Sequence, residues 1–190
     1  MAETSPALAD AFGAILDDRE RALDVPGVRA AMEAMVKERG VADRDPAGNT
    51  ALHALAMAEW YRDESLPAVV EAARVLLEAG ADVRARNAEG LLPLDVAVLE
   101  VNLPELVELL LSRGGAPETE RERQLFLDRY RELYDDNVDW DVDVVEGPDG
   151  PSSEYVCSMP DGFRDRQDRI VDALRAHGGP LFESLDVDQW

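Results

Sequence analysis

The sequence predicts an all-α fold, a solenoid of about three to four stacked helix pairs with degenerate pairs at both ends. A small β-hairpin is expected as an insert near residues 138–158. Three observations lead to this prediction. A segment that combines a turn with the start of a helix occurs twice in the 190 residues. The helix that follows each copy ends at glycine. The apolar residues change from a helical to a β period in the proposed insert alone.

The repeated segment begins at Asp45 and again at Asn87. The two copies read Asp45-Pro46-Ala47-Gly48-Asn49-Thr50-Ala51-Leu52-His53-Ala54-Leu55-Ala56 and Asn87-Ala88-Glu89-Gly90-Leu91-Leu92-Pro93-Leu94-Asp95-Val96-Ala97, and they align without a gap. Asp45 and Asn87 can bond to nearby backbone in a turn, and Gly48 and Gly90 supply a permissive backbone position. Thr50 can cap the helix that follows. This turn chemistry predicts where each helix pair begins.

A second, apolar helix is predicted after each copy, over about 67–79 and over 104–112. In the first of these, Val69, Val70, Ala73, Leu76 and Leu77 recur at three- and four-residue spacing, which places them on one stripe. The first helix stops at Gly80 and the second at Gly114-Gly115. One pair cannot cover such a stripe, so the pattern indicates that neighbouring pairs stack.

This pattern resembles the ankyrin repeat over about residues 41–116. The residues that carry the resemblance are Gly48, Thr50, Leu52, His53 and Ala56, then Gly80-Ala81-Asp82-Val83-Arg84-Ala85, then Gly90, Pro93, Leu94 and Ala97. The sequence departs from the family pattern at Ala51, where proline is usual, at Leu92, where threonine is usual, and at Asp95, where histidine is usual. The spacing of Gly48 and Gly80 indicates an insertion near 59–65. The resemblance implies a non-enzymatic module that binds another protein.

We expect one ankyrin-repeat domain over 1–179 and a tail over 180–190. Within the domain, 1–40 would form N-terminal cap helices (7–18 and 27–39), 41–116 the two clearest repeats, and 117–179 a degenerate repeat with an insert at 135–160. In that insert, Val138, Trp140, Val142 and Val144 alternate with aspartates, turn residues follow, and Glu154-Tyr155-Val156-Cys157 can return as a second strand. A disordered acidic loop is the alternative, because aspartate is a poor strand former.

The net charge of the chain limits the classes of partner that it can bind. The chain has 41 acidic and 19 basic residues and a net charge of −22. Such a field repels nucleic acid and anionic membranes, whereas it attracts a basic protein. A salt-adapted or GC-rich origin is the alternative explanation, because Lys37 is the only lysine. The first ten residues lack the basic start of a signal peptide, and a run of about 18 apolar residues is missing, so we expect a cytoplasmic protein.

The sequence offers no catalytic, cofactor-binding or metal-binding set. His53 lies in the turn motif and is interpreted as a structural hydrogen-bonding residue, while His177 lies in the last turn of a helix, where a cation is favourable. Cys157 is the single cysteine. The aspartates of 135–143 do not have the spacing of a calcium loop, and phosphate-binding glycine motifs are lacking. We therefore expect no enzyme and no cofactor.

The candidate functional residues lie on the surface that ankyrin repeats usually present to a partner, the turn tips and first helices, and on the acidic insert. They are Asn49, Trp60, Tyr61, Arg62, Arg86, Glu89, Leu91, Asp139, Trp140, Asp141 and Asp143. Trp60 and Tyr61 have local packing as an equally weighted alternative. Three competing functions stay open: a bacterial immunity or inhibitor protein that neutralises a basic toxin such as a nuclease, a carboxylate-based enzyme, and a salt-adapted scaffold. A monomer is assumed.

Overall fold

A computed structural model describes residues 25–57, 66–98, 103–137, 139–147, 150–158, 162–180 and 182. The helices are α2 (Val25–Arg39), α3 (Ala51–Ala56), α4 (Leu66–Glu78), α5 (Pro93–Val96), α6 (Pro104–Ser112), α7 (Glu120–Asn137) and α8 (Phe163–His177), and the strands are β1 (Asp139–Gly147) and β2 (Gly150–Ser158). The helix predicted at 7–18 and the insertion predicted at 59–65 lie outside the described residues, as does most of the predicted tail.

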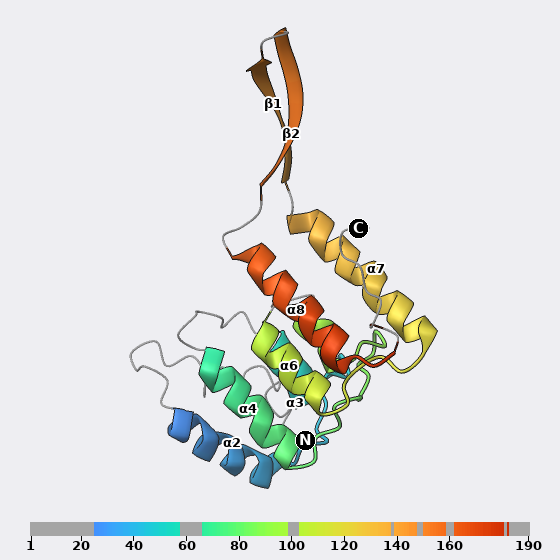
Figure 1. Ribbon diagram of the computed structural model, residues 1–190. Coiled ribbons are helices and arrows are strands. Elements are labelled where there is room, and N and C mark those ends of the chain that lie inside the picture. Colours follow the sequence, from blue (N-terminus) through green and yellow to red (C-terminus); the bar gives the residue numbers. More distant parts are fainter. Residues whose placement is uncertain are drawn as a thin grey trace.

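The helices form two layers. Helices α2, α4, α6 and α8 lie side by side, each in contact with the next, as Figure 1 shows. The short helices α3 and α5 pack on one another and against α4 and α6, respectively. Each long helix thus covers the apolar stripe of its neighbour. This arrangement confirms the predicted all-α architecture of stacked helix pairs.

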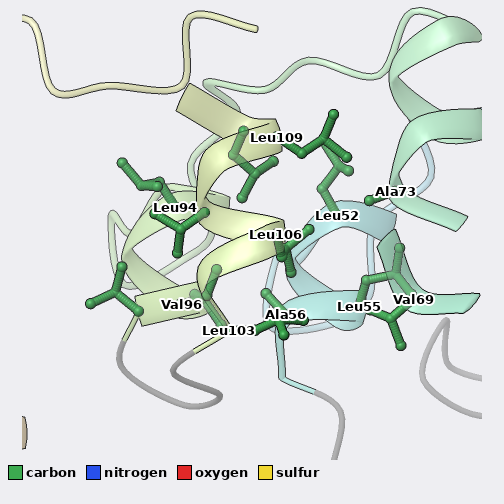
Figure 2. Packing of buried hydrophobic residues seen from close by; sticks show 14 of the residues in the cluster. Leu52, Leu55, Ala56, Val69, Ala73, Leu94, Val96, Leu103, Leu106 and Leu109 are labelled. Carbon is green, nitrogen blue, oxygen red and sulfur yellow. The ribbon is translucent and has the colours of Figure 1, made fainter. Parts of the chain in front are cut away.

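The core lies between the two layers. Leu52 and Leu55 of α3, Leu94 of α5 and Leu106 and Leu110 of α6 are almost completely buried. Figure 2 shows side chains from α3, α4, α5 and α6 converging on this region. Burial of one such leucine contributes about 1.5–3 kcal/mol, so the contacts between repeats, rather than the short helices themselves, hold the stack together.

At the end of the stack, α8 packs on α6, and α7 adds further residues to the same hydrophobic cluster. Ile170, Val171 and Leu174 of α8 are buried with the rest of the core. The ring of Phe182, just beyond α8, meets the ring of Phe126 on α7 edge-on at a centroid distance of 5.7 Å. A single hydrophobic cluster therefore runs from α2 through to α8 in the described residues.

Ion pairs join neighbouring helices of the long-helix layer. Arg29 on α2 lies 2.6 Å from Glu71 and 2.6 Å from Glu78, both on α4. The bonds to these carboxylates, led by the one to Glu71, raise the pKa of Arg29. On α8, Arg169 lies 2.8 Å from Glu105 of α6. Because all these groups are partly exposed, the pairs fix the alignment of the helices more than they add stability.

Between α7 and α8 the chain forms two antiparallel strands. The register runs from the pair Asp139 and Ser158 to the pair Gly147 and Gly150. Figure 1 shows β1 and β2 projecting away from the helices. The strands occupy the segment for which the sequence left a hairpin and an acidic loop as alternatives.

Candidate partner-binding surface

Two turns lie side by side at one edge of the stack. We call residues 44–50 the first turn and residues 86–92 the second turn. The N–H of Ala88 donates to the carbonyl of Ala47 at 2.9 Å and so joins the two turns directly. The guanidinium of Arg44 donates to the carbonyl of Gly48 in its own turn at 2.7 Å and to that of Arg86 at 2.8 Å. The two turns are therefore braced as one unit.

Each turn is also closed by the first side chain of its repeated segment, Asp45 or Asn87, as the sequence predicts. Oδ1 of Asp45 accepts the N–H of Asn49 at 2.8 Å, and Oδ1 of Asn87 accepts the N–H of Leu91 at 2.9 Å. The amide of Asn49 donates to Asp45 at 3.0 Å and accepts from the amide of Asn87 at 3.0 Å. Asn49 thus links the two turns from the inside.

The first helix of each pair begins with a polar side chain that bonds backwards to the turn. Nδ1 of His53 accepts the N–H of Thr50 at 3.2 Å and lies 2.8 Å from the hydroxyl of Thr50, and its Nε2 lies 2.9 Å from the carbonyl of Leu91. These partners fit a neutral ring whose Nε2–H donates to that carbonyl. In the second pair, Asp95 of α5 accepts the N–H of Leu92, the last residue of the second turn, at 2.8 Å. Asp95 therefore preserves the bond at the helix start although it replaces the usual histidine.

These turn residues account for most of the buried polar side chains. In the described part of the chain, Asn49, Thr50, His53, Asp95 and Gln167 are the buried polar or charged residues. Four of the five belong to the two turns or to the helix starts that follow them. Because a buried polar group is costly unless it is hydrogen-bonded, this network specifies the alignment of the turns.

The protonation of His53 links this network to pH. Burial lowers the pKa of His53 below its ordinary value of 6.5, an effect that the bond to the Leu91 carbonyl opposes and that Arg44 reinforces. The unfolded chain therefore takes up the proton at a higher pH than the folded protein does. The stabilisation is complete above pH 6.5 and is lost as the pH falls through the pKa that His53 has in the folded protein.

We therefore expect the free energy of unfolding to decrease as the pH drops below 6.5. His53 alone should contribute up to about 1.4 kcal/mol per pH unit. Urea unfolding of the wild type and of His53→Gln, at several values between about pH 5 and pH 8, measures this contribution. The advantage of the wild type over the variant should shrink as the pH decreases. A constant difference over that range would contradict the assignment. His177→Gln is the matched control, because His177 is exposed on α8.

A third element, the start of α7, is fixed to the second turn. Arg86 forms an ion pair with Glu122 and Arg84 lies 3.3 Å from the same carboxylate. Glu122 also accepts the N–H groups of Glu118 at 2.8 Å and Thr119 at 3.2 Å. Burial alone would raise the pKa of Glu122, but these N–H groups and the two arginines outweigh it and lower the pKa. The first turn, the second turn and the start of α7 thus form one continuous braced edge.

The structure places the predicted turn residues in different environments. Glu89 is exposed at the tip of the second turn, and the side chain of Arg86 is 41% exposed although it pairs with Glu122. Asn49 and Leu91 are buried, and their groups serve the bonds within and between the turns. Glu89 and Arg86 are therefore the turn-tip candidates whose side chains reach solvent.

The remaining candidates lie elsewhere. Trp60, Tyr61 and Arg62 lie outside the described residues. Asp139, Trp140, Asp141 and Asp143 belong to β1, which Figure 1 places apart from the turns. Sequence reasoning missed three bracing residues, Arg44, Arg84 and Glu122. A signal existed for the first, because Arg44 and Arg86 each stand directly before the first residue of a repeated segment.

The acidic charge is distributed unevenly along the chain. Residues 25–57 contain four basic and four acidic side chains, whereas the stretch between Arg131 and Arg164 contains ten acidic residues and no lysine or arginine. The ten are Glu132, Asp135, Asp136, Asp139, Asp141, Asp143, Glu146, Asp149, Glu154 and Asp161. This stretch spans the end of α7 and both strands. The negative potential of the molecule is therefore concentrated at its projecting end.

Comparison with protein families supports the assignment of the turns. A family model described as the ankyrin repeat matches residues 47–88. The match begins and ends at the two alanines that bond the turns to each other, so it covers one full step of the stack. The chain therefore contains an ankyrin repeat over these residues, and ankyrin repeats are typically non-enzymatic interaction modules. A search of curated proteins gave no match.

Two further findings concern the described residues. No helix among them is long and apolar enough to cross a membrane. In the same part of the chain, no three His, Cys, Asp or Glu side chains are grouped in a way that could hold a metal ion.

Proposed function

We propose that this protein is a non-enzymatic, cytoplasmic binding module, folded as one domain over 1–179, that recognises a basic protein. The observation that carries the proposal is the ankyrin repeat, whose turns and the start of α7 form one braced edge with Glu89 exposed at a tip. A preorganised surface binds with less loss of conformational entropy than a mobile one. The bonds that join the turns therefore favour recognition at their tips.

The uneven charge supports a basic partner. Adaptation to high salt would spread acidic residues over the whole surface, whereas residues 25–57 are balanced and the stretch between Arg131 and Arg164 is acidic throughout. A concentrated field attracts a protein of opposite charge and accelerates association. A bacterial inhibitor or immunity protein that offers carboxylates to the phosphate-binding site of a basic toxin is a sharper form of the same proposal.

The test is capture of partners by the immobilised full chain from an extract of the organism that encodes it, with quantitative mass spectrometry. Three baits are compared: the wild type, Glu89→Lys and Asp172→Lys. The last is a matched control, because Asp172 is exposed on α8 in the long-helix layer. We expect the wild type and Asp172→Lys to retain the same basic proteins and Glu89→Lys to lose them. Retained proteins that are no more basic than the extract, or equal retention by all three baits, would contradict the proposal.

A further inference from the structure

Among the residues that the structure describes, one edge of strand β1 has no neighbouring strand. Within the described residues, the sheet consists of β1 and β2 alone. The outer edge of β1 therefore presents backbone N–H and C=O groups that the sheet does not pair, a template for another strand. A two-stranded hairpin is only marginally stable in water, so a third strand would stabilise it.

The register divides the hairpin into two unlike faces. Residues that pair directly, and alternate residues of a strand, share a face. Asp139, Asp141 and Asp143 therefore share one face with Glu154, the partner of Asp143. Trp140, Val142 and Val144 occupy the other face with Tyr155, the partner of Val142. One face consequently carries four carboxylate residues together with Val145 and Val156, and the other is predominantly apolar but includes Glu146.

The two edges of the hairpin are not equivalent. Strand β1 lacks proline over its nine residues, and its glycine, Gly147, stands at the end. Strand β2 has Pro151 near its start, and proline has no backbone N–H to donate to a neighbouring strand. The edge of β1 is therefore the better template.

A second copy of this chain is a poor occupant for that edge. Antiparallel pairing of two β1 edges would bring the aspartates at 139, 141 and 143 of both copies together, and like charges on neighbouring strands are destabilising. A segment with basic residues at alternate positions would instead place its cations beside these carboxylates. Apolar residues at the positions between would meet the face of Trp140 and Val142.

We propose that the outer edge of β1 binds an extended basic segment of a partner protein, which adds to the hairpin as a third strand. This inference rests on the proposed binding of a basic protein and assigns a second contact region to it. The backbone bonds of the added strand would supply affinity, and the acidic and apolar faces would select alternating basic and apolar residues.

The test uses the full-length protein and a dye-labelled nine-residue peptide in which lysine and valine alternate. Fluorescence anisotropy measures the affinity, and amide hydrogen exchange measures protection along β1. We expect binding together with slower exchange over 139–147. Methylation of every second backbone nitrogen in the peptide should weaken binding at least about tenfold in the analogue whose methylated edge faces β1. The analogue methylated on the opposite edge is the matched control.

The charge contribution is tested in the protein. The triple variant Asp139→Asn, Asp141→Asn and Asp143→Asn should weaken binding about tenfold, whereas Asp165→Asn, Asp168→Asn and Asp172→Asn, an equal change on exposed positions of α8, should leave it unchanged. Replacement of residues 139–158 by a short glycine–serine linker should abolish binding, with the thermal unfolding of the helices as a check on folding.

Absence of binding at millimolar peptide, equal affinity of the two methylated peptides, or equal effects of the two triple variants would overturn the inference. The proposed function is tested by a separate result, the capture of partners by the three baits. Partners retained by the wild type and lost by Glu89→Lys would still support it even if the hairpin variants bind the peptide no differently from the wild type.

Discussion

Replacement of His53 by leucine is expected to lower the free energy of unfolding by about 2–3 kcal/mol. Leucine fills a similar buried volume but leaves the N–H and the hydroxyl of Thr50 without the acceptor that Nδ1 provides. The carbonyl of Leu91 would keep its bond from the N–H of Asn87 at 3.1 Å, so the cost falls mainly on Thr50. Loss of the ring also removes a bond between the first helix of one repeat and the turn of the next.

Urea unfolding at pH 7.5 measures this effect, since His53 is neutral there in both the folded and the unfolded chain. His177→Leu is the control, because that side chain is exposed at the end of α8. A loss of less than about 0.5 kcal/mol for His53→Leu would show that the ring does not hold the turn.

Replacement of Gly48 by alanine is expected to lower the free energy of unfolding by about 2–4 kcal/mol. Gly48 has φ of +76°, a conformation that other residues adopt at a cost, and a Cβ there would lie 2.9 Å from the backbone nitrogen of Ala88. That nitrogen donates to the carbonyl of Ala47, so the added methyl group would push against the bond that joins the two turns.

The chain provides a matched control at Gly90, which has φ of +82° and, apart from its own chain neighbours, no atom within 4 Å of the position that a Cβ would take. Gly90→Ala should therefore lower the free energy of unfolding only by the cost of the left-handed backbone conformation, about 1–2 kcal/mol. Thermal and urea unfolding of both variants separate the two contributions. Equal losses at the two positions would mean that the close approach of the turns is not a source of stability.

Much of the fold follows from the sequence because its main signals are local. Asp45 and Asn87 close their turns by bonds to residues only four positions away, and the apolar spacing of α4 needs no knowledge of the partner helix. Gly48 and Gly90 occupy the left-handed positions that the turn pattern requires. These features depend on short stretches of chain, so a single sequence is enough to recognise them.

The ion pairs and hydrogen bonds that brace the candidate surface could not be predicted from the sequence, because they join residues that lie far apart along the chain. In the sequence, Arg84 and Arg86 are separated from Glu122 by α5 and α6. Many other arginines and glutamates offered equally plausible pairs. Asn49 and Leu91 occupy turn tips by sequence position, yet the close stacking of the turns buries both. Which residues of a turn reach solvent is decided by the neighbouring turn rather than by the turn itself.

The direct bond between Ala47 and Ala88 has a consequence for how this protein can vary. The offset between the two turns is set where they touch, and not by the number of residues that connect α3 to α4. The length of that connection can therefore change among related chains without altering the spacing of the tips. New sequence can therefore be inserted between α3 and α4 while the braced edge of the two turns keeps its shape.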